Sequence, residues 1–163
     1  MATASGSTPL QTCRDAVEAL ARLPGWKLVA RSRWYRTVPV PPLPGAPPFV
    51  NGVVLLGREE GEAGGADPAG LLAVLHALED AAGRARPFPN APRTLDLDLI
   101  AMEGLRRAAP PPILPHPRAH LRRFVLRPLA DVWPGWRHPV FERTAEDLMA
   151  GLAGDDLPEA IAE

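Results

Sequence analysis

The 163-residue sequence has very little cysteine and very little lysine. Cys13 is the only cysteine, which excludes an internal disulfide framework and a cage of cysteine ligands around a metal. Lys27 is the only lysine, so 17 of the 18 basic residues are arginine, a bias for which a GC-rich genome is the simplest cause. A bound anion would therefore meet planar guanidinium groups rather than ammonium groups.

Long apolar runs and net charge are also lacking. No stretch approaches the roughly 18 consecutive apolar residues of a membrane-spanning helix. The opening MATASGSTPL has neither the basic start nor the apolar stretch of a secretory signal. A formal net charge of −1 gives no overall attraction to nucleic acid or anionic membranes. We therefore expect a soluble, cytoplasmic protein with neither a nucleic-acid nor a membrane partner.

Hydrophobic periodicity predicts helices and strands along one domain. Apolar residues three and four apart predict a helix at 9–23, ended by Pro24-Gly25. Alternation and β-branched residues predict strands at 26–37 and 49–57, on either side of a proline-rich loop. The remaining predicted elements are a helix capped by Asp67 and ended by Gly83, a strand at 93–100, a stiff loop at 109–117, short helical turns at 118–134 and a helix at 144–152.

This order predicts an α+β sandwich with a largely antiparallel sheet. At 163 residues and 46% hydrophobic composition, residues 1–163 are expected to form one domain. We expect residues 1–8 and 153–163 to be disordered, because chain ends fray unless they are tied down.

The stretch RTLDLDLI, at 93–100, places two carboxylates on one face of the predicted strand. Asp96 and Asp98 would lie about 7 Å apart along that strand, so solvent, arginines or a divalent metal must offset their repulsion. A solvated strand face is the simplest interpretation of such a pair alone. Two further features favour Mg²⁺ with a polyphosphate: His116 between two prolines, and arginines on both sides, which are Arg84, Arg86, Arg93, Arg118, Arg122 and Arg123.

The chain has neither a P-loop lysine motif nor a kinase-type glycine-rich loop. The segments RSRWYRT, APRTLDLDLI and LPHPRAHLRRFVLRPLADVWPGWRHP together resemble the 6-hydroxymethyl-7,8-dihydropterin pyrophosphokinases of folate biosynthesis. The resemblance runs in order from about Pro9 to about Leu152. It implies a ferredoxin-like sandwich that transfers diphosphate from ATP to a reduced pterin and releases AMP.

The resemblance also implies roles for particular residues. Asp96 and Asp98 would hold two Mg²⁺ ions that bridge the phosphates of ATP, the co-substrate. The implied catalytic arginines, which contact the phosphates, are Arg84 and Arg93. The other implied nucleotide-binding residues are Glu79, Leu99, His116 and Arg122, and the implied pterin-binding residues are Thr37, Val38, Phe49, Asn51 and Phe124.

The sequence departs from the family pattern in several places. His76 stands where an amide side chain is common, the loop at 86–92 is short, and prolines at 110–112 replace a basic residue. No hydrophobic strand precedes the first helix, so the first strand of the sheet is expected to be missing or replaced. Two alternatives follow: a truncated, catalytically impaired relative that binds pterin or nucleotide, and a different Mg²⁺–nucleotide transferase.

Overall fold

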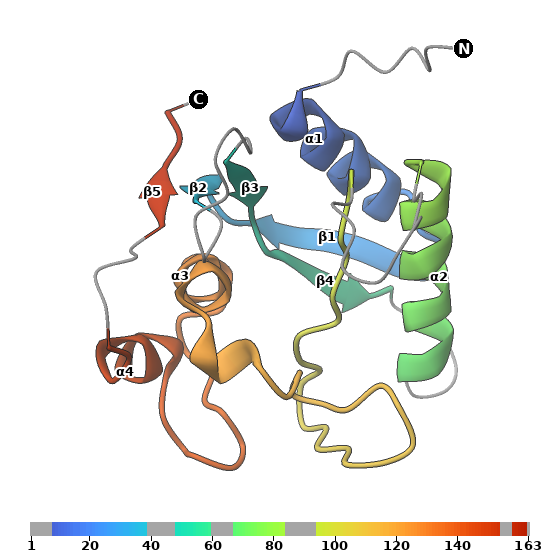
Figure 1. The fold of residues 1–163 in the computed structure, drawn as a ribbon. Coiled ribbons are helices and arrows are strands. Elements are labelled where there is room, and N and C mark those ends of the chain that lie inside the picture. The colour runs from blue at the N-terminus through green and yellow to red at the C-terminus, as the bar shows by residue number, and fades with distance from the viewer. Residues whose placement is uncertain (1–7, 39–47, 60–66, 84–93, 154–157, 163) are drawn as a thin grey trace.

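The computed structural model describes residues 8–38, 48–59, 67–83, 94–153 and 158–162 of the chain. Among these residues, no helix is both long enough and apolar enough to span a lipid bilayer. The elements, in chain order (Figure 1), are α1 (Pro9–Leu20), β1 (Trp26–Arg31), β2 (Tyr35–Thr37), β3 (Phe49–Asn51), β4 (Val54–Arg58), α2 (Pro68–Ala81), the 3-10 helix η1 (Ala119–Leu121), α3 (Arg123–Val132), α4 (Ala145–Ala150) and β5 (Glu159–Ala160).

Local capping explains where α2 begins. The carboxylate of Asp67 accepts hydrogen bonds from the backbone N–H groups of Ala69, at 3.0 Å, and Gly70, at 2.9 Å. Pro68 occupies the first helical turn, where its missing N–H costs nothing. The predicted N-cap is therefore confirmed. Helix α2 ends at Ala81, close to Gly83, which has a positive φ of 86°.

The two long strands predicted from the sequence are each interrupted. The first becomes β1 and β2, and the second becomes β3 and β4. β1 pairs with β4 and β2 pairs with β3, both antiparallel, so the expected antiparallel pairing is confirmed. At the interruption, the N–H of Ser32 donates to the carbonyl of Val53 at 2.9 Å, and the N–H of Val53 donates to Ser32 Oγ at 3.0 Å. These two hydrogen bonds take the place of the regular strand-to-strand bonds, so one long strand pair becomes two short ones.

A close approach explains the glycine at this break. A Cβ atom at Gly52 would lie 2.6 Å from the ring of Trp34, which is 4% exposed. A side chain there would displace the indole ring from its packed position. Gly52 therefore lets β3 turn into β4 beside a buried tryptophan.

The C-terminal segment is more ordered than the sequence predicts. Instead of fraying throughout, it forms β5, which pairs antiparallel with β2 on the edge opposite β3. The N–H of Ile161 continues this pairing by donating to the carbonyl of Trp34 at 2.9 Å. The open edge of β2 offers backbone groups that an extended segment can satisfy. The segment has a low strand propensity, so the sequence did not predict that it pairs with β2.

The main hydrophobic core lies between α3 and α4, the orange and red helices of Figure 1. Its centre is formed by Leu126, Leu129, Trp136 and Leu148, each 7% exposed or less. Two residues that follow the aspartate pair in sequence, Ile100 and Ala101, pack against this core. Residues 95–100, the aspartate segment, are thereby anchored at their far end.

The aspartate segment itself does not form the predicted strand. Residues 95–100 are part of the described chain and carry no strand assignment. The alternation predicted from the sequence is nevertheless present, because Asp96 and Asp98 are exposed while Leu95, Leu97 and Leu99 are half-buried. The segment is bonded to a side chain of α2 and to the loop before η1, rather than into a ladder.

Candidate functional site

The two carboxylates of the aspartate segment project into solvent on the same face. Asp96 and Asp98 are both exposed, and the leucines on either side of each are half-buried. Within the described residues, no group of three or more His, Cys, Asp or Glu side chains is arranged to hold a metal ion. Mg²⁺ commonly binds through one or two carboxylates and takes its other ligands from substrate phosphates and water. Two exposed carboxylates fit that pattern.

His116 lies within electrostatic reach of the aspartate pair. Burial lowers the pKa of its ring, the charge of Asp98 opposes that shift, and Arg122 and Arg118 add to it, so the pKa is below its ordinary value. The backbone N–H of His116 donates to the carbonyl of Ile100 at 2.7 Å, which ties the loop to the aspartate segment. The charges of Asp98, Asp96 and Arg122 therefore all act on the ring of His116.

The hydrogen bond at the ring of His116 identifies its tautomer. The backbone N–H of Arg118 donates to Nδ1 of His116 at 3.3 Å, so the proton of the neutral ring is on Nε2. His116 can therefore donate one hydrogen bond from Nε2 to an acceptor such as a phosphate or ribose oxygen. In the sequence Arg118 is one of several arginines near the aspartate pair, and a backbone hydrogen bond of this kind has no sequence signature.

Arg122 and Phe124 stand at the start of α3. The guanidinium carbon of Arg122 lies 5.5 Å from the centroid of the Phe124 ring, within cation–π range. Arg122 is half-buried, and Phe124 is 36% exposed. An aromatic face and a cation are therefore available together at this end of α3.

Glu79 lies closer to the protein interior than its predicted role implies. It is 2% exposed and follows Leu71 and Leu75 on the buried face of α2. Its Oε1 accepts a hydrogen bond from the backbone N–H of Leu97 at 2.9 Å. The structure thus places Glu79 against the backbone of the aspartate segment.

A second group of predicted residues gathers on β2 and β3. The side-chain amide of Asn51 donates to Oγ1 of Thr37 at 2.9 Å, which orients the amide plane. Thr37 pairs with Phe49 across the two strands. Val38 is 72% exposed and Phe49 is 52% exposed. This end of the strand pair offers apolar surface beside a fixed amide.

A polar network that sequence reasoning missed joins β2 to α3. The hydroxyl of Tyr35 donates to Oδ2 of Asp131 at 2.7 Å, and the backbone N–H of Arg33 donates to the same oxygen at 3.3 Å. Arg33 and Arg127 also form ion pairs with Oδ1 of Asp131, at 3.2 and 3.6 Å. One sequence signal was available: Arg127 and Asp131 are four residues apart, a spacing that pairs opposite charges on a helix. The network fixes α3, which carries Phe124, against β2, which carries Thr37.

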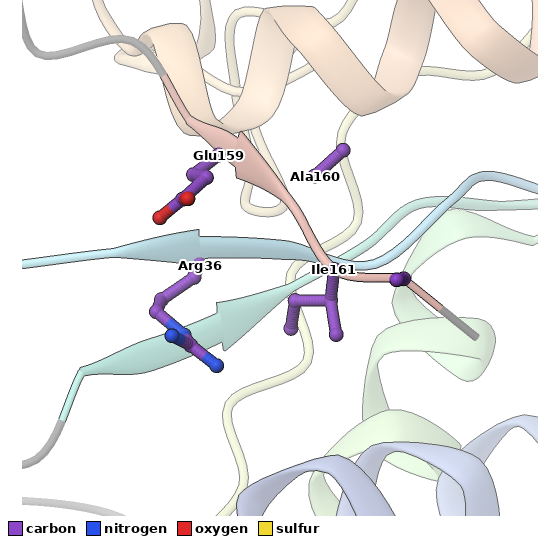
Figure 2. A pocket seen from close by; sticks show the side chains of 5 residues that line it. Arg36, Glu159, Ala160 and Ile161 are labelled. Carbon is purple, nitrogen blue, oxygen red and sulfur yellow. The ribbon is translucent and has the colours of Figure 1, made fainter.

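Three of the predicted residues have no side-chain contact described above. Arg84 and Arg93 lie outside the described residues. Leu99 is half-buried within the aspartate segment. A cavity of about 330 Å³ lies at the junction of β2 and β5 (Figure 2), lined by Arg36 and residues 159–162, and it includes none of the predicted site residues.

The family model and the relatives that match this chain describe the same enzyme. Residues 3–134 match the family model of 7,8-dihydro-6-hydroxymethylpterin-pyrophosphokinase. The chain is 37% identical over 150 residues to the 2-amino-4-hydroxy-6-hydroxymethyldihydropteridine pyrophosphokinase of Methylorubrum extorquens, covering 91% of this chain and 80% of that protein. It is 38% identical over 142 residues to the protein of the same name from Pseudomonas aeruginosa, covering 87% and 83%.

Proposed function

The chain belongs to the 7,8-dihydro-6-hydroxymethylpterin-pyrophosphokinase family, and on that premise we propose how its residues perform the reaction. The chain transfers diphosphate from ATP to the hydroxymethyl group of 6-hydroxymethyl-7,8-dihydropterin and releases AMP, a step of folate biosynthesis. The observation that carries this proposal is the place of His116, whose ring feels the charges of the two exposed carboxylates and of Arg122. Acidic oxygens and basic donors together suit a metal–polyphosphate ligand.

Asp96 and Asp98 are the proposed ligands of two Mg²⁺ ions. Both side chains are exposed, so a metal bound to polyphosphate can reach them without a change of fold. When bound, the two ions would neutralise phosphate charge and acidify the attacking hydroxyl. The half-buried leucines between and around the aspartates hold the carboxylates on one side. The chain's own contribution is to present two oxygen ligands at a fixed spacing.

The nucleotide is proposed to lie between the aspartate pair and the start of α3. His116 would donate from Nε2, and Arg122 would supply a positive charge that also acts on the His116 ring. Leu99 lies within the same segment, where its backbone would lie near the adenine. Arg84 and Arg93 are proposed to contact the transferred phosphates and offset their developing charge.

The pterin is proposed to bind at the end of β2 and β3. Asn51, held by Thr37, would pair with the amide edge of the heterocycle. Phe49 and Phe124 would stack on its two faces, and backbone groups at Thr37 and Val38 would contact its edge. The Asp131 network would keep the α3 side and the β2 side of this site at a constant separation.

The finer architecture is also part of the proposal. In a ferredoxin-like sandwich, the aspartate segment would be a strand of the central sheet. Residues 95–100 have the alternating burial of a strand, although the described part of the chain provides no ladder for them. We propose that a further strand of the sheet pairs with this segment. We also propose that the chain acts as one monomeric domain on its two small substrates.

The test is release of AMP by the purified chain. AMP should appear only when ATP, Mg²⁺ and 6-hydroxymethyl-7,8-dihydropterin are all present, and omission of any one should abolish it. Calorimetry that detects nucleotide binding while no AMP forms would instead indicate an impaired relative. AMP formation with other acceptors but not with the reduced pterin would indicate a different Mg²⁺–nucleotide transferase.

A further inference from the structure

Glu79 is an acidic residue in an apolar stripe. Leu71, Leu75 and Glu79 recur every four residues on the buried face of α2, and Glu79 is the least exposed of the three, at 2%. A leucine at this position would continue the stripe without any desolvation of a carboxylate. A buried carboxylate is retained in a fold only when hydrogen bonds compensate its lost hydration. Its partner therefore indicates what Glu79 does.

That partner is the backbone between the two predicted metal ligands. Oε1 of Glu79 accepts the N–H of Leu97 at 2.9 Å, and Leu97 separates Asp96 from Asp98 in the chain. A hydrogen bond to a carboxylate is roughly twice as strong as one between neutral groups. The bond fixes the orientation of Leu97, whose half-buried side chain lies opposite the two exposed carboxylates. Rotation of this residue would move both carboxylates.

A second tie holds the other end of the segment. The carbonyl of Ile100 accepts the N–H of His116 at 2.7 Å, and the side chain of Ile100 packs on the α3–α4 core. The aspartate segment is therefore attached to α2 through Glu79 and to the core through Ile100. Because residues 95–100 carry no strand assignment, these contacts hold them in place of a sheet ladder.

We propose that Glu79 is a positioning residue for the metal-binding aspartates and does not contact the nucleotide. The carboxylate holds the N–H of Leu97 and thereby sets the direction and spacing of Asp96 and Asp98. With 2% of its surface exposed, Glu79 has almost no surface left for contact with a ligand. This inference rests on the proposed function only in identifying Asp96 and Asp98 as metal ligands.

Three substitutions separate positioning from direct contact. Glu79→Ala removes the acceptor and the packing, Glu79→Leu removes the acceptor but restores apolar volume, and Glu79→Gln keeps an acceptor oxygen without the charge. Glu18→Ala on the exposed face of α1 is the control for loss of a helical glutamate. The measurements are hydrogen exchange at the Leu97 amide, with the buried Leu126 amide as an internal reference, and calorimetric binding of Mg²⁺–ATP without pterin.

Exchange at Leu97 relative to Leu126 should accelerate about tenfold or more in Glu79→Leu and Glu79→Ala, because a charge-assisted bond is lost. Mg²⁺–ATP affinity should fall by a similar factor in both variants, while pterin affinity measured separately stays unchanged. Glu79→Gln should retain most of the protection and most of the affinity. If Glu79→Ala fails to fold, Glu79→Leu gives the same comparison with the stripe intact.

Two results would overturn the proposal. Unchanged Leu97 exchange in Glu79→Leu would mean that Glu79 does not hold the segment. Loss of Mg²⁺–ATP affinity in Glu79→Gln, equal to that in Glu79→Leu but with Leu97 still protected, would mean that the charge contacts the ligand. A wild-type chain that makes no AMP but shows Glu79-dependent protection of Leu97 would refute the proposed function and leave the hydrogen bond established.

Discussion

Replacing Asp131 with alanine removes the acceptor that joins β2 to α3. In the native chain this carboxylate accepts hydrogen bonds from the hydroxyl of Tyr35 at 2.7 Å and from the backbone N–H of Arg33 at 3.3 Å. Tyr35 is 1% exposed, so its hydroxyl depends on Asp131 for its acceptor in the native chain. Burial, together with this hydrogen bond, raises the pKa of Tyr35, which therefore remains a donor throughout the neutral range.

The expected cost comes mainly from the Tyr35 hydroxyl. A buried donor left without an acceptor costs about 1–3 kcal/mol, and a hydrogen bond to a charged group contributes a comparable amount. The Arg33 ion pair adds little, because the Arg33 side chain is 57% exposed and solvent screens the pair. We therefore expect Asp131→Ala to lower the free energy of unfolding by about 2–3 kcal/mol. For a domain of this size that corresponds to a fall in Tm of roughly 4–12 °C.

The assay is equilibrium unfolding in urea at pH 7, followed by circular dichroism. Asp131→Asn retains an acceptor oxygen for Tyr35 and should lose only about 1 kcal/mol. Asp15→Ala removes an exposed carboxylate that accepts only a surface bond from Gln11, and it should change stability by no more than about 0.5 kcal/mol. An unfolding midpoint for Asp131→Ala equal to that of Asp15→Ala would refute this reasoning.

Two further predictions concern pH and the pterin site. Burial would raise the pKa of Asp131, but hydrogen bonds from Arg33 and Tyr35 hold it below its ordinary value of 3.8. Its stabilising contribution is therefore complete above about pH 3.8 and is lost as the pH falls through the lower folded-state value, so acid unfolding scans should show a smaller loss in Asp131→Asn than in wild type. Asn51→Ala should weaken pterin binding about tenfold or more by removing a specific hydrogen-bonding edge, with Mg²⁺–ATP binding unchanged in calorimetry; equal weakening of both ligands would contradict the assignment.

Local chemistry made parts of the fold predictable. The start of α2 depends on Asp67 and Pro68, which are adjacent in sequence and act on the next few backbone groups. The faces of residues 95–99 follow from the alternation of leucine and aspartate, which the burial pattern reproduces. Helix capping and two-residue alternation both depend on only a few neighbouring residues.

Long-range partners were not predictable in the same way. Leu97 donates to Glu79, 18 residues earlier, and Tyr35 donates to Asp131, 96 residues later, so no local pattern reveals either bond. The predicted strand at 93–100 was wrong because period-two burial indicates an extended backbone but does not supply a neighbouring strand. The short strand β5 forms because β2 offers it an edge.

The sequence predicted the candidate site mainly from the aspartate pair and from the basic residues near it in the chain. The acidic pair, His116 and Arg122 could be proposed together from sequence, and the charges of Asp98, Arg122 and Asp96 all act on the ring of His116. The sequence could not reveal that Glu79 is buried, because helical periodicity alone allowed it to face either the interior or a ligand. The structure shows that Leu71 and Leu75 lie on the buried face of α2, and that Glu79 continues it at the same step of four.

The most direct test of the central claim is the rate of AMP release by Asp96→Ala and Asp98→Ala at saturating ATP, Mg²⁺ and reduced pterin. Asp15→Ala serves as the control for removal of an exposed aspartate. If the two carboxylates hold the metal ions of the reaction, each substitution should reduce turnover by several orders of magnitude, while folding by circular dichroism remains intact. Turnover near the wild-type rate in both variants would contradict the account.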